Sequence, residues 1–136
     1  MKIAIIYSPQ HRKLEAAAKT LGQTLEGKGH RIDYLHISKT DRPPNVRRYD
    51  FVCLGSVAEG TFGGKVPVAV SEYIKQCRGF EGTKSATFMM KRFLSLNNRG
   101  LRRLMAVLEH MGSMVMDFQL ISHKSDAEIL GKRLGG

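Results

Sequence analysis

Cysteine and long apolar runs are scarce in this chain of 136 residues, and both shortages narrow the classes of protein to which it can belong. Its two cysteines, Cys53 and Cys77, lie far apart and form no Cys-x-x-Cys pair. We therefore expect reduced thiols in the core of a cytoplasmic protein. No apolar run approaches the roughly 18 residues that a membrane-spanning helix needs. Met1-Lys2 leads directly into a strand-like segment, so no signal peptide is expected.

Common catalytic motifs are absent as well. The five histidines show neither His-Glu-x-x-His nor His-x-His spacing, which argues against a zinc site. Among them, His36 ends a strand-like run, and a structural role is favoured over a catalytic one. The sequence contains no Walker loop, Gly-x-Ser-x-Gly or Gly-x-Gly-x-x-Gly. Triphosphate-binding, hydrolase and dinucleotide-binding functions therefore lack support.

Acidic residues are few relative to basic ones. The chain has 22 Lys and Arg against 12 Asp and Glu, a formal charge of +10 and a pI near 10.0. Such an excess favours anionic ligands, acidic partners or nucleic acid. Residues 82–108 hold six bases and no acid: Lys84, Lys91, Arg92, Arg99, Arg102 and Arg103. This segment is either a nucleic-acid surface or a solvated basic helix face.

The rest of the composition is that of an ordinary globular domain, with 42% apolar and 25% charged residues. Apolar runs typical of strands alternate with apolar residues at helical spacing, as in Leu14, Ala18, Leu21 and Leu25. Strands are predicted over 2–7, 30–37, 50–54, 85–90 and 114–121, and helices over 13–26, 67–77, from 99, and over 126–134 with Ser125 or Asp126 as a cap. Crossovers between buried strands predict an α/β fold, a parallel sheet with helices on both faces, in one domain over 1–136. The methionines late in the chain are expected to pack the core around the last two strands.

The segment from Asp50 to Cys77 is the most informative. An apolar strand ends at Gly55-Ser56, and a loop of small residues ends at Gly63-Gly64-Lys65-Val66-Pro67 before a helix. A buried strand, a small-residue loop and a helix opened by proline are typical of the ligand-binding edge of open α/β sheets.

These residues, from Tyr49 to Ser56 and from Gly63 to Pro67, together with Gly131-Lys132-Arg133-Leu134, resemble the flavodoxin-like family over essentially the whole chain. The resemblance implies a three-layer α/β/α sandwich with five parallel strands in the order 2-1-3-4-5. It also implies a crevice at the carboxyl ends of strands 1, 3 and 4, which holds FMN in flavodoxins and FMN reductases.

The first loop would hold the FMN phosphate. Family members have a loop rich in Ser and Thr there, and Ser8 is the residue of this chain that fits it. Bases follow and supply positive charge instead of the family's hydroxyls. The candidates are Ser8, Gln10, His11, Arg12 and Lys13. The stretch is either a phosphate site or an exposed basic helix start.

Two further loops would hold the rest of the flavin. In the second loop Gly55 and Ser56 match the family, while Phe62 either stacks on the ring or folds back over the domain. Gly63 and Gly64 complete that set. After the fourth predicted strand the candidates are Lys91, Arg92 and Asn97.

Two functions follow from these residues. The chain is expected to be an FMN-binding electron-transfer protein or small reductase, with an atypical basic phosphate loop. The alternative is a flavin-free domain whose basic crevice binds another anionic or phosphorylated small molecule or an acidic redox partner. Nucleic acid is the less favoured partner.

Overall fold

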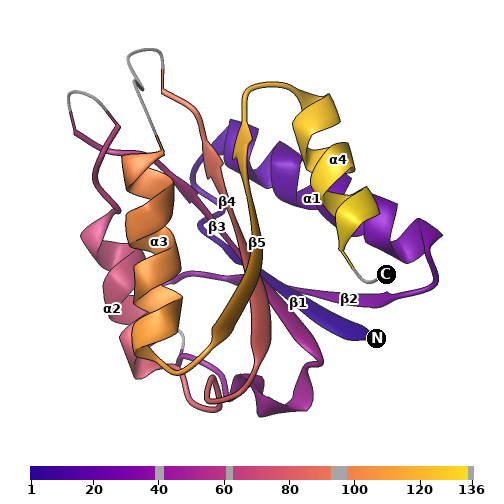
Figure 1. The fold of residues 1–136 in the computed structure, drawn as a ribbon, viewed down its shortest axis with the longest axis horizontal. Coiled ribbons are helices and arrows are strands. Elements are labelled where there is room, and N and C mark those ends of the chain that lie inside the picture. The colour runs from indigo at the N-terminus through magenta and orange to yellow at the C-terminus, as the bar shows by residue number, and fades with distance from the viewer. Residues whose placement is uncertain (39–41, 61–62, 93–97, 135–136) are drawn as a thin grey trace.

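The computed structural model describes residues 1–38, 42–60, 63–92 and 98–134. Strands and helices alternate along them (Figure 1). In chain order the elements are β1 (Lys2–Tyr7), α1 (Arg12–Gly27), β2 (Arg31–His36), the 3-10 helix η1 (Val46–Arg48), β3 (Phe51–Val57), α2 (Val68–Gln76), β4 (Lys84–Met90), α3 (Arg99–His110), β5 (Met114–Ile121) and α4 (Lys124–Arg133). The predicted strands and helices are thereby confirmed, with boundary shifts of a few residues. Among the described residues, no helix is long and apolar enough to cross a bilayer.

The five strands form one sheet in the order β2-β1-β3-β4-β5, and every neighbouring pair is parallel. The order that the family resemblance implied is therefore correct. Since β1, β3 and β4 each have a strand on both sides and helices above and below, their residues are almost all buried.

Alternate residues of the strands build two apolar cores, one on each face of the sheet. Ile3 and Ile5 pack with α1 and α4, whereas Ala4 and Ile6 belong to the core beneath α2 and α3. The two helix pairs lie on opposite sides of the strands in Figure 1. The predicted apolar face of α1 is confirmed, because Leu14, Ala18, Leu21 and Leu25 are fully buried.

Strand β3 is longer than the sequence predicted. It continues through Gly55 and Ser56 to Val57, where a break was expected, and Gly55 lies opposite Phe88 of β4. A Cβ atom on Gly55 would come within 2.2 Å of the Phe88 ring. The glycine is therefore needed for close packing between neighbouring strands, and it does not end the strand.

The expectation for the late methionines is wrong in part. Met89 is buried, but Met114 and Met116 of β5 are 48% and 57% exposed. β5 is an edge strand, and its register against β4 shifts between Ser85 and Ala86. An edge strand has fewer neighbours to cover its side chains, so an apolar residue there does not imply burial.

Both cysteines are free and buried, as expected. Burial raises the pKa of the Cys53 and Cys77 thiols to about 12, which leaves them protonated and unreactive at neutral pH.

Candidate functional site

The carboxyl edge of the sheet brings the predicted site segments together. Parallel strands end at the same edge, so the residues that follow β1, β3, β4 and β5 all lie there, and α1, α3 and α4 begin there. The first-loop candidates, the pair Gly63-Gly64 and the pair Lys91-Arg92 lie in these connections or at their helix starts. Phe62 and Asn97 lie outside the described residues.

The start of α1 is basic and has no side-chain cap. His11 occupies the N-cap position without accepting a hydrogen bond on its side chain, and Arg12 and Lys13 are the first two helical residues. All three are exposed. The first backbone N–H groups of a helix have no partner within it, and the helix dipole makes this end positive. Each base at this end lowers the stability of the fold by about 0.3–1 kcal/mol. A bound anion would offset that repulsion and accept hydrogen bonds from the N–H groups.

Gly55 and Ser56 lie near the end of strand β3, just before this edge. Both are buried within β3, and the Ser56 hydroxyl donates to the Val57 carbonyl at 2.8 Å. Both residues therefore belong to the strand that ends at this edge and not to the connection that follows it.

The connection after β3 folds back against α3. Glu59 and Lys65 exchange backbone hydrogen bonds of 2.9 and 3.0 Å, which closes a small antiparallel turn. A Cβ atom on Gly100 would lie 2.4 Å from the Gly63 carbonyl oxygen, and one on Gly64 would lie 3.1 Å from the Arg99 side chain. These contacts hold the connection after β3 against the first turn of α3.

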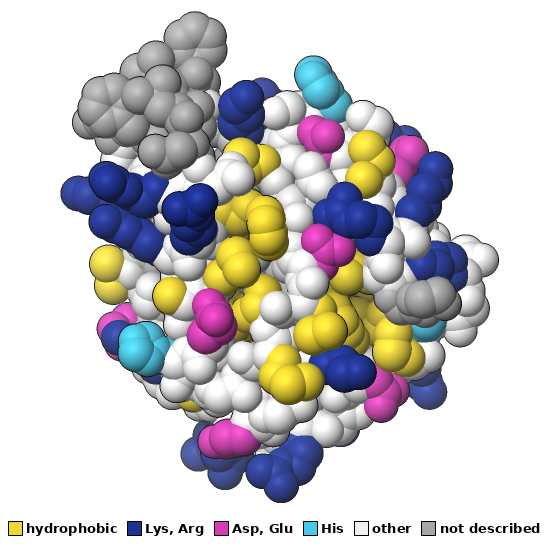
Figure 2. Space-filling model, in the orientation of Figure 1, with side chains coloured by type: hydrophobic (Ala, Val, Ile, Leu, Met, Phe, Trp, Pro, Cys, Tyr) yellow, Lys and Arg dark blue, Asp and Glu magenta, His cyan; other side chains and the backbone are white. Residues whose placement is uncertain are grey.

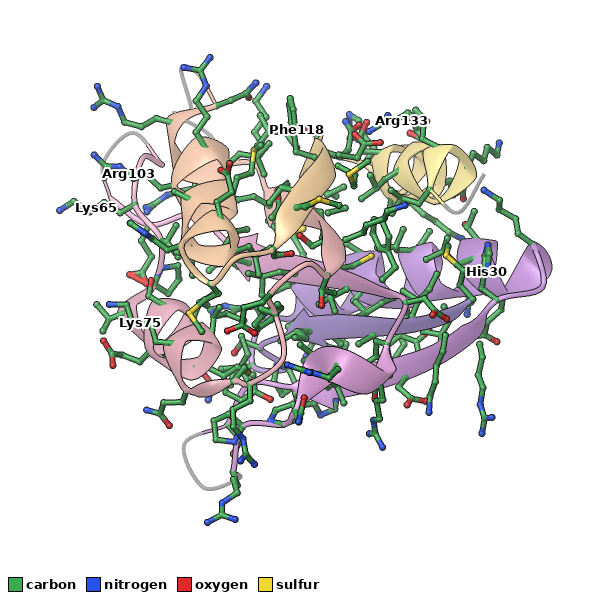
Figure 3. All side chains as sticks on the ribbon, turned by 60° about the horizontal axis from the view of Figure 1, so that its bottom comes forward. His30, Lys65, Lys75, Arg103, Phe118 and Arg133 are labelled. Carbon is green, nitrogen blue, oxygen red and sulfur yellow. The ribbon has the colours of Figure 1, made fainter. Side chains whose placement is uncertain are left out.

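The start of α3 is the second basic region of this edge. Asn98 makes no side-chain cap there, and the first turn contains no acid. Bases gather around it, as Figure 2 shows beside the start of this helix, and Lys65 and Arg103 lie on the same side of the molecule in Figure 3. The exposed ones are Lys65, Lys91, Arg92, Arg99, Arg102 and Arg103.

The start of α4 is built differently, and the sequence prediction missed it. The helix begins at Lys124, with His123 rather than Ser125 or Asp126 as the N-cap. The Asp126 carboxylate instead accepts the backbone N–H groups of Ser122 and His123, at 2.8 and 2.9 Å. These two hydrogen bonds are the main reason that the pKa of Asp126 is lowered. An acid three residues after the N-cap was the available signal.

His36 contacts Tyr7 rather than a group of catalytic residues. Its Nε2 lies 3.0 Å from the hydroxyl of Tyr7, the last residue of β1. Burial, and secondarily the Glu15 carboxylate, raise the pKa of Tyr7. In the part of the chain that the structure describes, no group of three or more His, Cys, Asp or Glu side chains could hold a metal ion.

No protein-family model and no curated protein sequence matches the chain. Solved structures do match in fold. Flavodoxin 1 from Bacillus cereus superposes with a TM-score of 0.78 at 16% identity, covering 98% of this chain and 94% of that one. The two-electron reduced flavodoxin of Megasphaera elsdenii gives 0.76 at 17% identity and 96% of both chains. An archaeal flavodoxin gives 0.73 at 16% identity, with 99% and 94% covered. The resemblance stated from the sequence is thus confirmed in the fold: the chain has the flavodoxin-like fold over nearly its whole length.

Proposed function

We propose that this chain is an FMN-binding electron-transfer protein with a basic phosphate site at the start of α1. The observation that carries the proposal is the open, basic start of that helix at the carboxyl edge of a flavodoxin-like sheet. The two buried free thiols agree with the expected cytoplasmic location.

The donor set at the start of α1 fits a phosphate group. The Ser8 hydroxyl, the first N–H groups of the helix and the side chains of Arg12 and Lys13 are all donors, and the last two carry positive charge. Gln10 and His11 lie on the same turn and add further polar groups. When bound, FMN would supply one-electron and two-electron chemistry, while these residues hold and orient it.

The ring would lie between the connections after β3 and β4. Gly63, Gly64, Lys91 and Arg92 are the described candidates there, and Phe62 and Asn97 stay predictions from the sequence. Gly55 and Ser56, which are buried in β3, would support the crevice from below. Small residues in the connection after β3 allow a flat ligand to approach the backbone.

The test is a visible absorption spectrum of the purified protein, followed by titration of the apoprotein with FMN. Arg12→Glu should weaken FMN binding about tenfold or more, because a charged hydrogen-bond donor is replaced by a repelling acid. Arg31→Glu is the matched control, since Arg31 is exposed and begins β2 at the opposite edge of the sheet. Equal affinities of the two variants would disprove the proposed phosphate site.

The bases beside α3 favour an acidic redox partner. Lys65, Lys91, Arg102 and Arg103 are exposed around the proposed ring site, so opposite charge would speed the encounter. The reduced protein should be reoxidised by anionic ferricyanide faster than the difference in redox potential between the two predicts. This rate enhancement should shrink as the salt concentration rises. The double variant Arg102→Glu, Arg103→Glu should remove most of it. If hexaamminecobalt, a cation, shows the same salt dependence, the partner assignment is wrong.

A flavin-free binding domain is the second candidate. It is favoured by the bases at the starts of both α1 and α3, and by the lack of an aromatic side chain among residues 57–60, 63–67, 91–92 and 98. A colourless protein that ignores FMN but gains thermal stability with pyrophosphate would support it. Binding to single-stranded nucleic acid that weakens steeply with salt would instead identify the α3 surface as a polyanion site.

A further inference from the structure

A separate cavity of about 260 Å³ opens between the first halves of α1 and α4. Its lining residues include the last residues of β4 and β5, on the face of the sheet that these two helices cover. Of the residues proposed for FMN, Lys13 alone is among those that line it.

Close contacts between the second half of α4 and the end of α1 fix the spacing of the two helices, and the cavity lies beside their starts. A Cβ atom on Gly131 of α4 would lie 2.7 Å from Thr24 of α1. The Lys28 ammonium donates to the carbonyls of Gly131 and Lys132, at 3.2 and 3.0 Å, and to that of Leu134. Toward the carboxyl edge, small side chains of α1, at Ala16 and Ala17, leave the space unfilled.

The floor of the cavity is apolar. Met90 and Ile121 lie opposite each other as the last residues of β4 and β5, and both side chains belong to the core beneath α1 and α4. Together with Ala17 they offer a surface from which a ligand's apolar part would displace water.

The rim of the same cavity is cationic. Lys13 comes from α1 and Lys124 from the start of α4, so lysines of two helices line one opening, and His123 adds a polar ring beside them. No Asp or Glu is among the lining residues. Asp126, the adjacent acid, is already engaged by the backbone N–H groups of Ser122 and His123.

We propose that this cavity binds a small amphipathic organic anion, with a phosphate or carboxylate group at the rim and an apolar body on the floor. The proposal does not depend on FMN binding. A volume of about 260 Å³ lies just below the roughly 300–1,000 Å³ of most ligand pockets, so the apolar part should be no larger than roughly one aromatic ring.

The experiment uses phenyl phosphate and benzoate as probes, with the protein saturated in FMN if it proves to bind FMN. Calorimetry should detect binding of at least one probe. Nitrogen–proton NMR spectra should show that this binding shifts the amide signals of Thr20, Ser122 and Lys124. Inorganic phosphate and benzyl alcohol each lack one half of the expected ligand and should bind more weakly. The proposal would be overturned if inorganic phosphate bound as tightly as phenyl phosphate, if FMN displaced the bound probe, or if neither probe bound.

Two variants locate the probe. Ala16→Phe places a ring in the cavity from an exposed helical position and should abolish binding. Lys124→Gln should weaken binding about twofold to fivefold, as expected for one exposed charge. Lys132→Gln removes the same charge from the last turn of α4, outside the cavity, and should leave binding unchanged. Binding that survives Ala16→Phe would place the probe elsewhere and refute the site.

Discussion

The starts of α1 and α4 lie at the same edge of the sheet, but they treat the positive end of a helix in opposite ways. At α4 the Asp126 carboxylate accepts two backbone N–H groups and supplies negative charge. At α1 the N-cap side chain makes no such bond, and Arg12 and Lys13 follow it. Of these two starts, α4 is closed by an acid and α1 is left open, as the proposed phosphate site requires.

The largest expected effect comes from separating the two helices. Gly131→Val would place side-chain atoms against Thr24 and should lower the free energy of unfolding by about 1–3 kcal/mol, as overpacking does. Urea denaturation measures the change. Lys132→Val has the same β-branched side chain at the next, exposed position and should cost much less. Similar losses in both variants would mean that helix propensity, not the helix contact, is responsible.

Removing the cap of α4 should have the next largest effect. Asp126→Ala leaves the N–H groups of Ser122 and His123 without their acceptor, at a cost of about 1–2 kcal/mol. Chemical denaturation at pH 7 checks this value. Glu128→Ala removes a carboxylate two residues further along the same helix and should be close to neutral. A large loss for Glu128→Ala would show that net charge matters more than capping.

Giving α1 an acidic N-cap should make its start more stable and less able to bind an anion, like the start of α4. His11→Asp places an acid at the N-cap and should raise the free energy of unfolding by about 0.5–1 kcal/mol. The same variant should bind FMN more weakly, because the carboxylate repels the phosphate. Gln10→Asp adds the charge one residue earlier, without the cap. If His11→Asp stabilises the protein and leaves FMN affinity unchanged, the start of α1 is not the phosphate site.

The smallest expected effect is a pH dependence at α4. The pKa of Asp126 is lowered from its ordinary value of 3.8 in the folded protein, so its ionised form stabilises the fold above that value. That stabilisation is lost as pH falls through the folded pKa. The stability difference between wild type and Asp126→Asn should therefore be constant near pH 6–7 and shrink below about pH 4. A constant difference down to pH 2 would exclude the carboxylate as its source.

Elements with strong periodicity could be predicted from the sequence, and packing between distant segments could not. The apolar face of α1 was correct because Leu14 to Leu25 repeat at helical spacing. Gly55 was misread because the ring that requires it, Phe88, lies 33 residues away on the next strand. The cavity between α1 and α4 was missed for the same reason, since its lining comes from residues 13–20, 90 and 121–124.

Lys28 connects two distant parts of the chain, since the first carbonyl to which it donates lies 103 residues further along. At a synthesis rate of about 5–20 residues per second, roughly 5–20 seconds separate α1 from that partner on the ribosome. Throughout this interval the side of α1 that Ala127 and Leu130 will cover has no native cover. If α1 forms as soon as it is synthesised, part of its apolar face therefore stays exposed until α4 emerges.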